Sequence, residues 1–316
     1  FGGIEFKDTK PQRNVNFEET RNELRKGFYN ATITYFEPTH SDLWVLRVRP
    51  DNGDISHKPG QYSTLGLGYF EDRIDDAIET DIDDRWDKLV RRAYSISNRI
   101  FTDDKYLATT NGADVDELEF YIVLVPPTPG NVPGLTPRLA LKRPGDRIFL
   151  GPKVAGRYTL APITDPNQNV LLLSTGTGEA PHNSMIVELL GKGHTGQITS
   201  VVSVRNLKDL GYIDKHQELE KRYSNYKYIP LPTREVNIPK RYIQDLLKIG
   251  VIEDEFGVEI DPSNTHVFLC GNPSMIGKPE EQEGVLIFPE TSTPGAIELL
   301  LERGFKIDSR KNPGTI

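Results

Sequence analysis

The sequence predicts two domains of different class, an antiparallel β domain followed by a parallel α/β domain. Its 316 residues exceed the usual size of a single domain, which is roughly 150 residues. The first half contains runs rich in β-branched and aromatic residues, without the period of an amphipathic helix. In the second half, short apolar strands alternate with helix-like stretches, which indicates a parallel sheet covered by helices.

The β domain is expected to contain strands at residues 31–36, 43–48 and 118–125. Turn sequences such as Pro50-Asp51-Asn52-Gly53 and Pro144-Gly145-Asp146 separate these strands at the intervals typical of a small barrel. In the α/β domain, strands are expected at residues 169–173, 197–204 and 266–269, with helices at 181–190 and 240–249. The predicted boundaries are an N-terminal extension at residues 1–27, a β domain at 28–163 and an α/β domain at 164–316.

Composition excludes several classes of protein. The net charge of −8 argues against a nucleic-acid binder that relies on a general basic field. The single cysteine, Cys270, cannot form an internal disulfide or an iron–sulfur cluster of the protein's own. No apolar run approaches the roughly 18 residues of a membrane span, and no histidines have zinc-ligand spacing, so neither a span nor a metal is expected. The cytoplasm is the expected compartment.

An acidic segment occupies residues 71–88, with nine acidic and three basic side chains. The first interpretation is a solvated insertion in a surface loop. The alternative is a docking surface for a basic partner.

A glycine-rich turn, Gly176-Thr177-Gly178, follows an apolar strand and opens a predicted helix. At such a position the backbone N–H groups and the helix dipole favour an anion, and glycine lets the backbone approach a pyrophosphate. The turn alone is a weak signal, because it lacks the full dinucleotide fingerprint.

Three arginines after this turn favour a dinucleotide with a 2′-phosphate. The strand after the glycine-rich turn ends in Arg205, where sheets that bind NAD carry an acidic residue. Arg234 and Arg241 lie near the next helix. Guanidinium groups bind phosphate bidentately, so these three residues favour the 2′-phosphate of NADP over the free hydroxyl of NAD. Surface arginines without a ligand are the alternative.

Two shorter motifs add to this interpretation. Arg92 and Tyr94 lie two residues apart on a predicted strand and therefore share a face, which could bind a phosphate and a flat ring. Cys270 and Gly271 end a later strand, at the sheet edge where α/β folds bind ligands. A lone cysteine is otherwise a small buried apolar residue.

In this order along the chain, the motifs resemble those of the ferredoxin (flavodoxin)–NADP(+) reductase family, bacterial type. The signatures are Arg92-Ala93-Tyr94-Ser95, Gly176-Thr177-Gly178 with Pro181, and Cys270-Gly271-Asn272-Pro273 followed by Met275. The resemblance runs from about residue 28 to residue 314 and so covers nearly the whole chain.

The resemblance implies an N-terminal antiparallel FAD-binding β-barrel and a Rossmann-like α/β domain that binds NADP(H). Arg92 would pair with the flavin pyrophosphate, Tyr94 would stack on the isoalloxazine, and Ser95 would lie near flavin N5. Cys270 would face the nicotinamide, so Tyr94, Ser95 and Cys270 are the expected catalytic residues. The other expected cofactor-binding residues are Ala93, Tyr121, Ile122, Val123, Leu124, Gly134, Leu135, Thr136, Gly176, Thr177, Gly178, Arg205, Arg234, Arg241 and Gly271.

The activity implied is electron transfer between NADP(H), which exchanges two electrons as hydride, and ferredoxin or flavodoxin, which exchanges one. Because this chain cannot build an iron–sulfur cluster, the one-electron partner would be a separate protein. One alternative is a related NADPH-dependent flavin reductase that serves an oxygenase or another acceptor. A different class, a non-catalytic nucleotide-binding subunit of the same fold, also remains open.

The C-terminal end departs from the family pattern. Members of this type commonly end in an aromatic residue that covers the flavin, whereas this sequence ends in Ile316. Lys306, Arg310 and Lys311 form a candidate basic patch for an acidic ferredoxin, with a solvated tail as the alternative.

Overall fold

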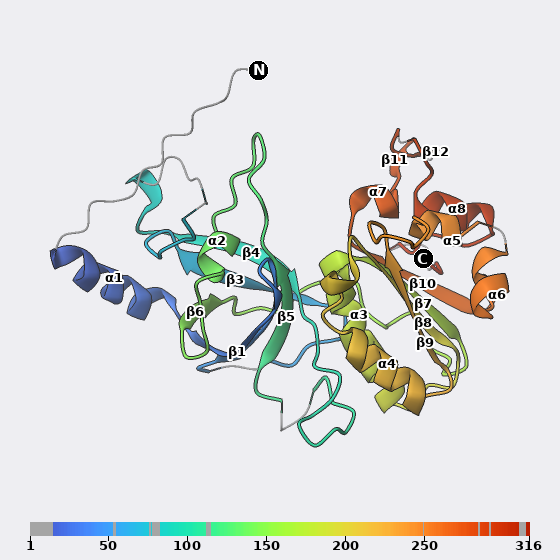
Figure 1. Cartoon of the computed structure of the whole chain (residues 1–316), viewed down its shortest axis with the longest axis horizontal. Helices are drawn as coiled ribbons and strands as arrows, with labels where there is room; N and C mark the ends of the chain where they lie inside the picture. Colours follow the sequence, from blue (N-terminus) through green and yellow to red (C-terminus); the bar gives the residue numbers. More distant parts are fainter. Residues whose placement is uncertain are drawn as a thin grey trace. The chain divides into compact units, whose positions relative to one another are not determined.

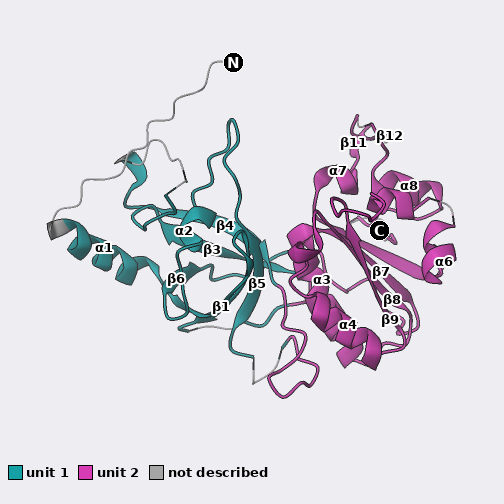
Figure 2. Cartoon of the chain, viewed as in Figure 1, with its two compact units in different colours: residues 1–57, 61–96, 111–157 teal, residues 58–60, 97–110, 158–316 magenta. Residues whose placement is uncertain are grey.

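The computed structural model describes residues 15–52, 55–75, 77, 83–111, 115–248, 250–283, 285–290, 292–309 and 314–316. The chain divides into two compact units, each described here by itself (Figure 2). Unit 1 consists of Phe1–His57, Gln61–Ile96 and Asn111–Arg157, and unit 2 of Lys58–Gly60, Ser97–Thr110 and Tyr158–Ile316. The sequence did not predict the two short early segments of unit 2.

Unit 1 is built on a six-stranded antiparallel sheet. Its strand order is β4-β3-β6-β1-β2-β5 (Figure 1). The edge strands β4 and β5 also contact each other, so the sheet curls toward the predicted barrel. The strands are β1 (Ala31–His40), β2 (Leu43–Pro50), β3 (Tyr62–Gly68), β4 (Leu89–Ser95), β5 (Leu118–Val123) and β6 (Arg147–Leu150).

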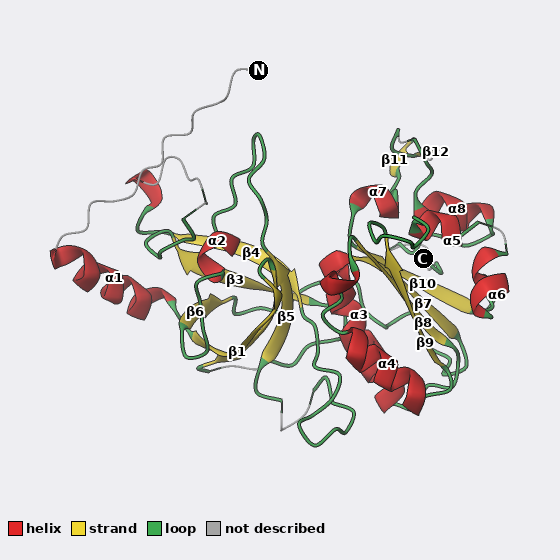
Figure 3. Cartoon of the chain, in the orientation of Figure 1, coloured by secondary structure: helices red, strands yellow, loops and turns green. Residues whose placement is uncertain are grey.

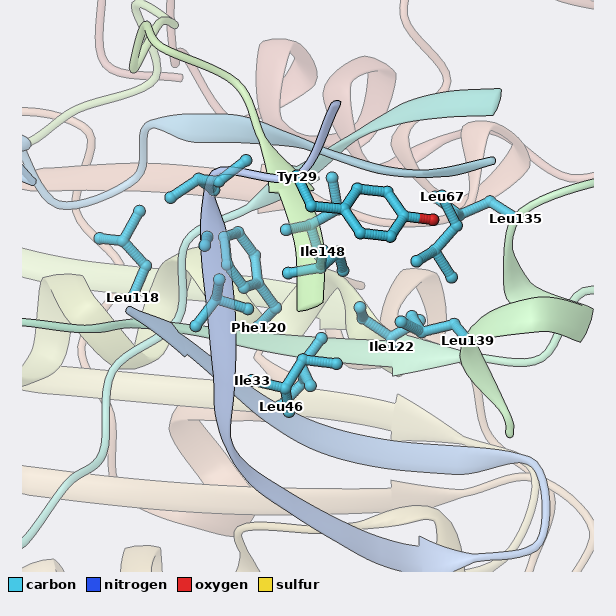
Figure 4. Close-up of a cluster of buried hydrophobic side chains, with 14 of the residues drawn as sticks. Tyr29, Ile33, Leu46, Leu67, Leu118, Phe120, Ile122, Leu135, Leu139 and Ile148 are labelled. Atoms are coloured by element: carbon cyan, nitrogen blue, oxygen red, sulfur yellow. The ribbon is translucent and has the colours of Figure 1, made fainter. Parts of the chain in front are cut away.

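The core of unit 1 lies inside this curled sheet (Figure 4). Ile33 of β1, Leu46 of β2, Phe120 of β5 and Ile148 of β6 are fully buried and converge on it. Their alternation with more exposed neighbours in β1 and β6 is the two-residue period expected of a sheet with one buried face.

Among the described residues of unit 1, the helices α1 (Val15–Phe28) and α2 (Thr136–Leu139) and a 3-10 turn, η1 (Asp83–Arg85), accompany the sheet. Most of α1 lies in the predicted N-terminal extension, but Leu24 and Phe28 pack against the core of unit 1. The helix is therefore part of the unit.

Glu71 anchors α1 to unit 1. Its carboxylate, almost fully buried, accepts two hydrogen bonds from Arg25, both 2.8 Å long, and others from Lys142 at 2.8 Å and Tyr29 at 2.9 Å. Burial raises the pKa of Glu71, but Arg25 and Lys142 outweigh it and hold that pKa at about 2. The expectation of a solvated acidic loop is therefore wrong for Glu71, because the cations packed around it compensate its charge. Residues 76 and 78–82 of that segment lie outside the described residues.

Unit 2 is built on a four-stranded parallel sheet of order β10-β7-β8-β9. Every residue of β8 is buried, as expected for a strand covered on both faces. The strands are β7 (Asn169–Thr175), β8 (Ile198–Val204), β9 (Tyr226–Pro232) and β10 (Thr265–Cys270), with a separate hairpin of β11 (Glu280–Gln282) and β12 (Val285–Ile287).

Helices cover both faces of this sheet (Figure 3). The α3 and α4 helices lie on one face, and Leu246 of α5, Ile252 of α6 and Leu300 of α8 join the apolar cluster on the other. The helical segments are η2 (Gly176–Gly178), α3 (Glu179–Gly191), η3 (Leu207–Asp209), α4 (Ile213–Arg222), α5 (Ile243–Leu246), α6 (Val251–Phe256), α7 (Pro273–Ile276) and α8 (Ala296–Glu302).

The helix expected at residues 240–249 is shorter than predicted. Tyr242 is extended and precedes α5, and Asp245 accepts a hydrogen bond from its backbone N–H. Gly250 was expected to end this helix. It has φ of +82° and lies immediately before a second helix, α6. The Asp245 cap therefore sets a later start for α5, and the left-handed backbone of Gly250 separates α5 from α6.

A long excursion between α7 and α8 is closed at its base by two glycines. A Cβ on Gly277 would lie 2.5 Å from the Cα of Gly295, so the two backbones are in direct contact. The hairpin of β11 and β12 lies within this excursion, with Val285, Leu286 and Ile287 exposed.

Candidate functional site

The glycine-rich turn and the end of β10 pack directly against each other at the carboxyl edge of the unit 2 sheet. A Cβ on Gly178 would lie 2.4 Å from the carbonyl oxygen of Cys270, which no side chain tolerates. Gly271 has φ of +132°, and a Cβ there would lie 2.1 Å from Oγ1 of Thr175. That Oγ1 also accepts a hydrogen bond from the N–H of Asn272, at 2.6 Å. The two turns can meet only because both positions are glycine.

Cys270 is half-buried beside this contact. Burial raises the pKa of its thiol to about 11, so the thiol is uncharged at neutral pH. Thr177, in the middle of the turn, remains partly exposed. The structure thus brings the turn and Cys270 together, as the predicted nucleotide site requires.

The three predicted phosphate-binding arginines lie in different surroundings. The N–H of Arg234 donates to the carbonyl of Arg205 at 2.8 Å, so β8 and β9 present these two exposed residues side by side. Arg241 instead forms an ion pair with both carboxylate oxygens of Glu255 in α6, at 2.6 and 2.5 Å. Solvent weakens an ion pair this exposed, so Arg241 can exchange Glu255 for another anion.

In unit 1, β4 carries the Arg92-Ala93-Tyr94-Ser95 motif. The guanidinium of Arg92 is exposed, and its Nη1 donates to the carbonyl of Arg91 at 2.8 Å. The ring of Tyr94 packs partly on the core, and burial raises its pKa to about 12 despite the opposing charge of Arg92. Ala93 is exposed and Ser95 partly exposed. All four are therefore accessible in part.

The remaining predicted cofactor-binding residues of unit 1 differ in the solvent exposure of their side chains. Val123 and Leu124 have accessible side chains, whereas Ile122 and Leu135 belong to the buried core. The hydroxyl of buried Thr136 accepts the N–H of Val125 at 3.2 Å. Tyr121 and Gly134 are likewise buried. Buried members of this group could contact a ligand only through small exposed backbone areas.

Similarity to known proteins bears on this arrangement. Residues 172–280 match the family model described as the oxidoreductase NAD-binding domain. A flavodoxin/ferredoxin–NADP reductase of Escherichia coli is 35% identical over 224 residues, which cover 69% of this chain and 75% of that protein. The corresponding protein of Shigella flexneri is 34% identical over 223 residues, with the same coverage. The chain belongs to the flavodoxin/ferredoxin–NADP reductase family.

The fold agrees with this membership. A ferredoxin NADP+ reductase from Neisseria gonorrhoeae, solved with bound FAD and NADP, superposes with a TM-score of 0.65 at 22% identity. The match covers 92% of this chain and 96% of that one. Both predicted sheets, antiparallel in unit 1 and parallel in unit 2, are therefore those of the reductase fold.

The reductase chain also contains a part-buried Tyr–His pair that the sequence did not reveal. The hydroxyl of Tyr158 lies 2.7 Å from Nε2 of His182, and the Tyr158 ring packs edge-on against Phe268 of β10. Burial lowers the pKa of His182 to about 3. Burial also raises the pKa of Tyr158, and the nearby Cys270 raises it further. Both groups are uncharged at neutral pH, so the nearby Tyr158 brings no charge to Cys270.

Other expectations can be compared with the described part of the reductase chain. Within it, no helix is long and apolar enough to cross a membrane. Those same residues contain no cluster of His, Cys, Asp and Glu suited to a metal ion. Of the predicted basic patch, Arg310 and Lys311 lie outside the described residues, and exposed Lys306 lies inside them.

Proposed function

We propose that this protein is an FAD-containing oxidoreductase that passes electrons between NADP(H) and ferredoxin or flavodoxin. Family membership supports the activity, and unit 2 supports the nucleotide. The observation that carries the proposal is the glycine contact that brings the Gly176–Gly178 turn against Cys270.

NADP(H) is proposed to bind along the carboxyl edge of the unit 2 sheet. The turn offers backbone without side chains for the pyrophosphate, and Cys270 lies next to it for the nicotinamide. Arg205 and Arg234, whose backbones are hydrogen-bonded to each other, offer exposed guanidinium side chains for the 2′-phosphate. Arg241 joins them when it releases Glu255.

FAD is proposed to bind on unit 1, where the residues present fit it. Arg92 is an exposed cation for the pyrophosphate, and Tyr94 presents a neutral, partly exposed aromatic ring for stacking. Ser95 follows on the same strand, opposite Tyr62 of β3. Val123, Leu124 and the backbone at Gly134 complete the proposed site.

A bound flavin supplies the exchange between two-electron and one-electron chemistry, and the chain positions what reacts. Hydride transfer needs close alignment, about 3–3.5 Å between reacting atoms, rather than a strong acid or base. The neutral Cys270 thiol, close to the neutral Tyr158, can pack against a nicotinamide without attracting a counter-ion. Ser95 and Tyr94 are the proposed unit 1 residues nearest the reaction. The single cysteine fits a reducing compartment, and the cytoplasm is the one proposed.

The test is an anaerobic titration of the purified holoprotein with NADPH and, in parallel, with NADH. We expect NADPH to bleach the visible flavin band at a much lower concentration than NADH. Purified ferredoxin or flavodoxin should then be reduced in the presence of catalytic protein. A flavin band that neither nucleotide bleaches would contradict the proposal. Rapid bleaching without transfer to either protein would favour the alternative flavin reductase.

A further inference from the structure

A buried carboxylate lies directly behind the glycine-rich turn in unit 2. Glu179 is the next residue after the turn, begins α3 and is fully buried. Its Oε1 accepts a hydrogen bond from the hydroxyl of Tyr228 at 3.1 Å and lies 3.0 Å from Nε2 of His216. Its Oε2 is buried without a hydrogen-bond partner among the described residues. One oxygen alone therefore holds the carboxylate.

His216, in α4, connects this carboxylate to the neighbouring elements. Its Nδ1 lies 2.7 Å from the hydroxyl of Tyr226 in β9, and its Nε2 lies 3.1 Å from Oδ1 of Asn183 in α3. The imidazole also stacks on the ring of Tyr228, with centroids 4.3 Å apart and planes 8° from parallel. Because Nε2 faces acceptor oxygens, it carries a hydrogen. The Tyr226 hydroxyl can donate to Nδ1 or accept from it.

The network continues into the early segment of unit 2. Nδ2 of Asn183 donates to the hydroxyl of Ser97 at 3.3 Å, and that hydroxyl lies 3.3 Å from the hydroxyl of Tyr212. All three residues are buried. Hydrogen bonds therefore join the first turns of α3 to α4, β9 and the segment that begins at Ser97.

Stability alone does not account for such a network. A buried ionic or polar group usually stabilises a fold no more than a well-packed apolar residue of similar volume. A hydrogen-bonded network instead specifies one arrangement of the elements it joins. The adjacent turn cannot fix its own conformation through side chains, because Gly176 and Gly178 have none and Gly176 has φ of +54°. Neighbouring residues must therefore hold the turn in one arrangement.

We propose that Glu179 is a positioning residue for the Gly176–Gly178 turn, with His216 and Tyr228 holding its carboxylate in place. This inference rests on the proposed function, in which the turn binds the pyrophosphate and nicotinamide half of NADP(H). Loss of the anchor then weakens binding of that half. The adenosine 2′-phosphate half, bound near Arg205 and Arg234, keeps its affinity.

The experiment compares two ligands on the holoprotein by titration calorimetry. NADP+ requires both halves of the site, whereas adenosine 2′,5′-bisphosphate contains only the half that the arginines bind. Glu179→Leu should weaken NADP+ binding about tenfold or more, and Tyr228→Phe, which removes one hydrogen bond, about threefold. Both variants should bind adenosine 2′,5′-bisphosphate as the wild type does.

Two further variants serve as rescue and control. Glu179→Gln keeps an acceptor oxygen and the side-chain shape, so it should retain most of the NADP+ affinity lost in Glu179→Leu. Glu220, also in α4, accepts the backbone N–H of Tyr228 at 2.9 Å. Glu220→Gln keeps that acceptor, so it should bind both ligands normally.

The outcomes separate this inference from the proposed function. A wild-type protein that does not bind NADP+ contradicts the proposed function itself. If the wild type binds, unchanged NADP+ affinity in Glu179→Leu and Tyr228→Phe overturns the positioning role. Equal losses for both ligands also overturn it, because the damage would then be general. Where thermal unfolding shows that Glu179→Leu does not fold, the same comparison in Tyr228→Phe decides.

Discussion

At the scale of single residues, Gly178 is tightly constrained by the backbone of its neighbours. Gly178→Ala would drive a Cβ toward the Cys270 carbonyl, so either the turn or the end of β10 must shift. We expect kcat/KM for NADPH to fall about tenfold or more, because small misplacements of reacting groups reduce rates strongly. Steady-state kinetics of the folded variant measure this.

Gly191 provides the matched control for that substitution. It ends the helix that Gly178 precedes, and a Cβ there would meet only a Leu107 methyl at an ordinary 3.8 Å. Gly191→Ala should therefore leave kcat/KM near that of the wild type. Equal kinetics for the two variants would show that the contact with Cys270 is unimportant for the reaction.

The arginines predict how the protein distinguishes NADPH from NADH. Arg205→Ala combined with Arg234→Ala should weaken NADPH about tenfold or more and leave NADH nearly unchanged, since only NADPH carries the 2′-phosphate. Arg241→Ala should have a smaller effect, because Glu255 already holds that guanidinium. The ratio of kcat/KM for the two nucleotides measures both effects. Equal losses for NADPH and NADH would exclude the 2′-phosphate assignment.

At the scale of elements, the anchor of α1 predicts acid sensitivity. The pKa of Glu71 is about 2 in the folded protein and about 4.3 in an unfolded chain. Its contribution to stability is therefore complete above about pH 5 and is lost as the pH falls toward 2, on the order of 3 kcal/mol in total. Glu71→Gln should destabilise the protein at pH 7 and match the wild type increasingly well on acidification.

Denaturant unfolding at several pH values between 7 and 3 measures this difference. Glu18→Gln is the control, because Glu18 also pairs with an α1 arginine, Arg21, but is exposed. That variant should differ little from the wild type at any pH. A Glu71→Gln difference that stays constant with pH would contradict the low pKa of Glu71.

The hydrophobic period and the turn residues in the sequence predicted the helices and strands whose structure depends mainly on their own residues. The strands β2, β7, β8 and β10 and the helix α3 were predicted to within about two residues of their observed bounds, whereas β1 continues to His40, beyond its predicted end at Phe36. The ion pairs of Glu71 could not be predicted from local sequence, because Arg25 lies 46 residues before Glu71 and Lys142 lies 71 residues after it. In the sequence, Glu179 is an ordinary carboxylate at the start of a helix. Only the fold brings Tyr228 of β9 and His216 of α4 next to it.

At the scale of the whole molecule, unit 2 is assembled from separate parts of the chain, and this predicts that residues 158–316 depend on residues 97–110 for stability. The segment Ser97–Thr110 supplies the Ser97 hydroxyl to Asn183 and the Thr110 hydroxyl to Glu188. A fragment of residues 158–316 should therefore be less stable than the same fragment carrying residues 97–110 on a flexible linker. Thermal unfolding midpoints of the two fragments measure this, and a linked segment with Ser97→Ala should give an intermediate value. Identical midpoints for all three would show that the segment adds nothing to unit 2.

The contact between Gly277 and Gly295 has a consequence for how this protein can be altered. A Cβ on Gly295 would lie 2.3 Å from the Cα of Gly277, so the two ends of the excursion touch backbone to backbone. The excursion can therefore be lengthened, shortened or exchanged while α7 and α8 keep their places, since its two ends meet whatever lies between them. For an engineer this is a natural splice point for a reporter or affinity tag. In evolution it is a position where relatives can gain or lose sequence at little cost to the fold.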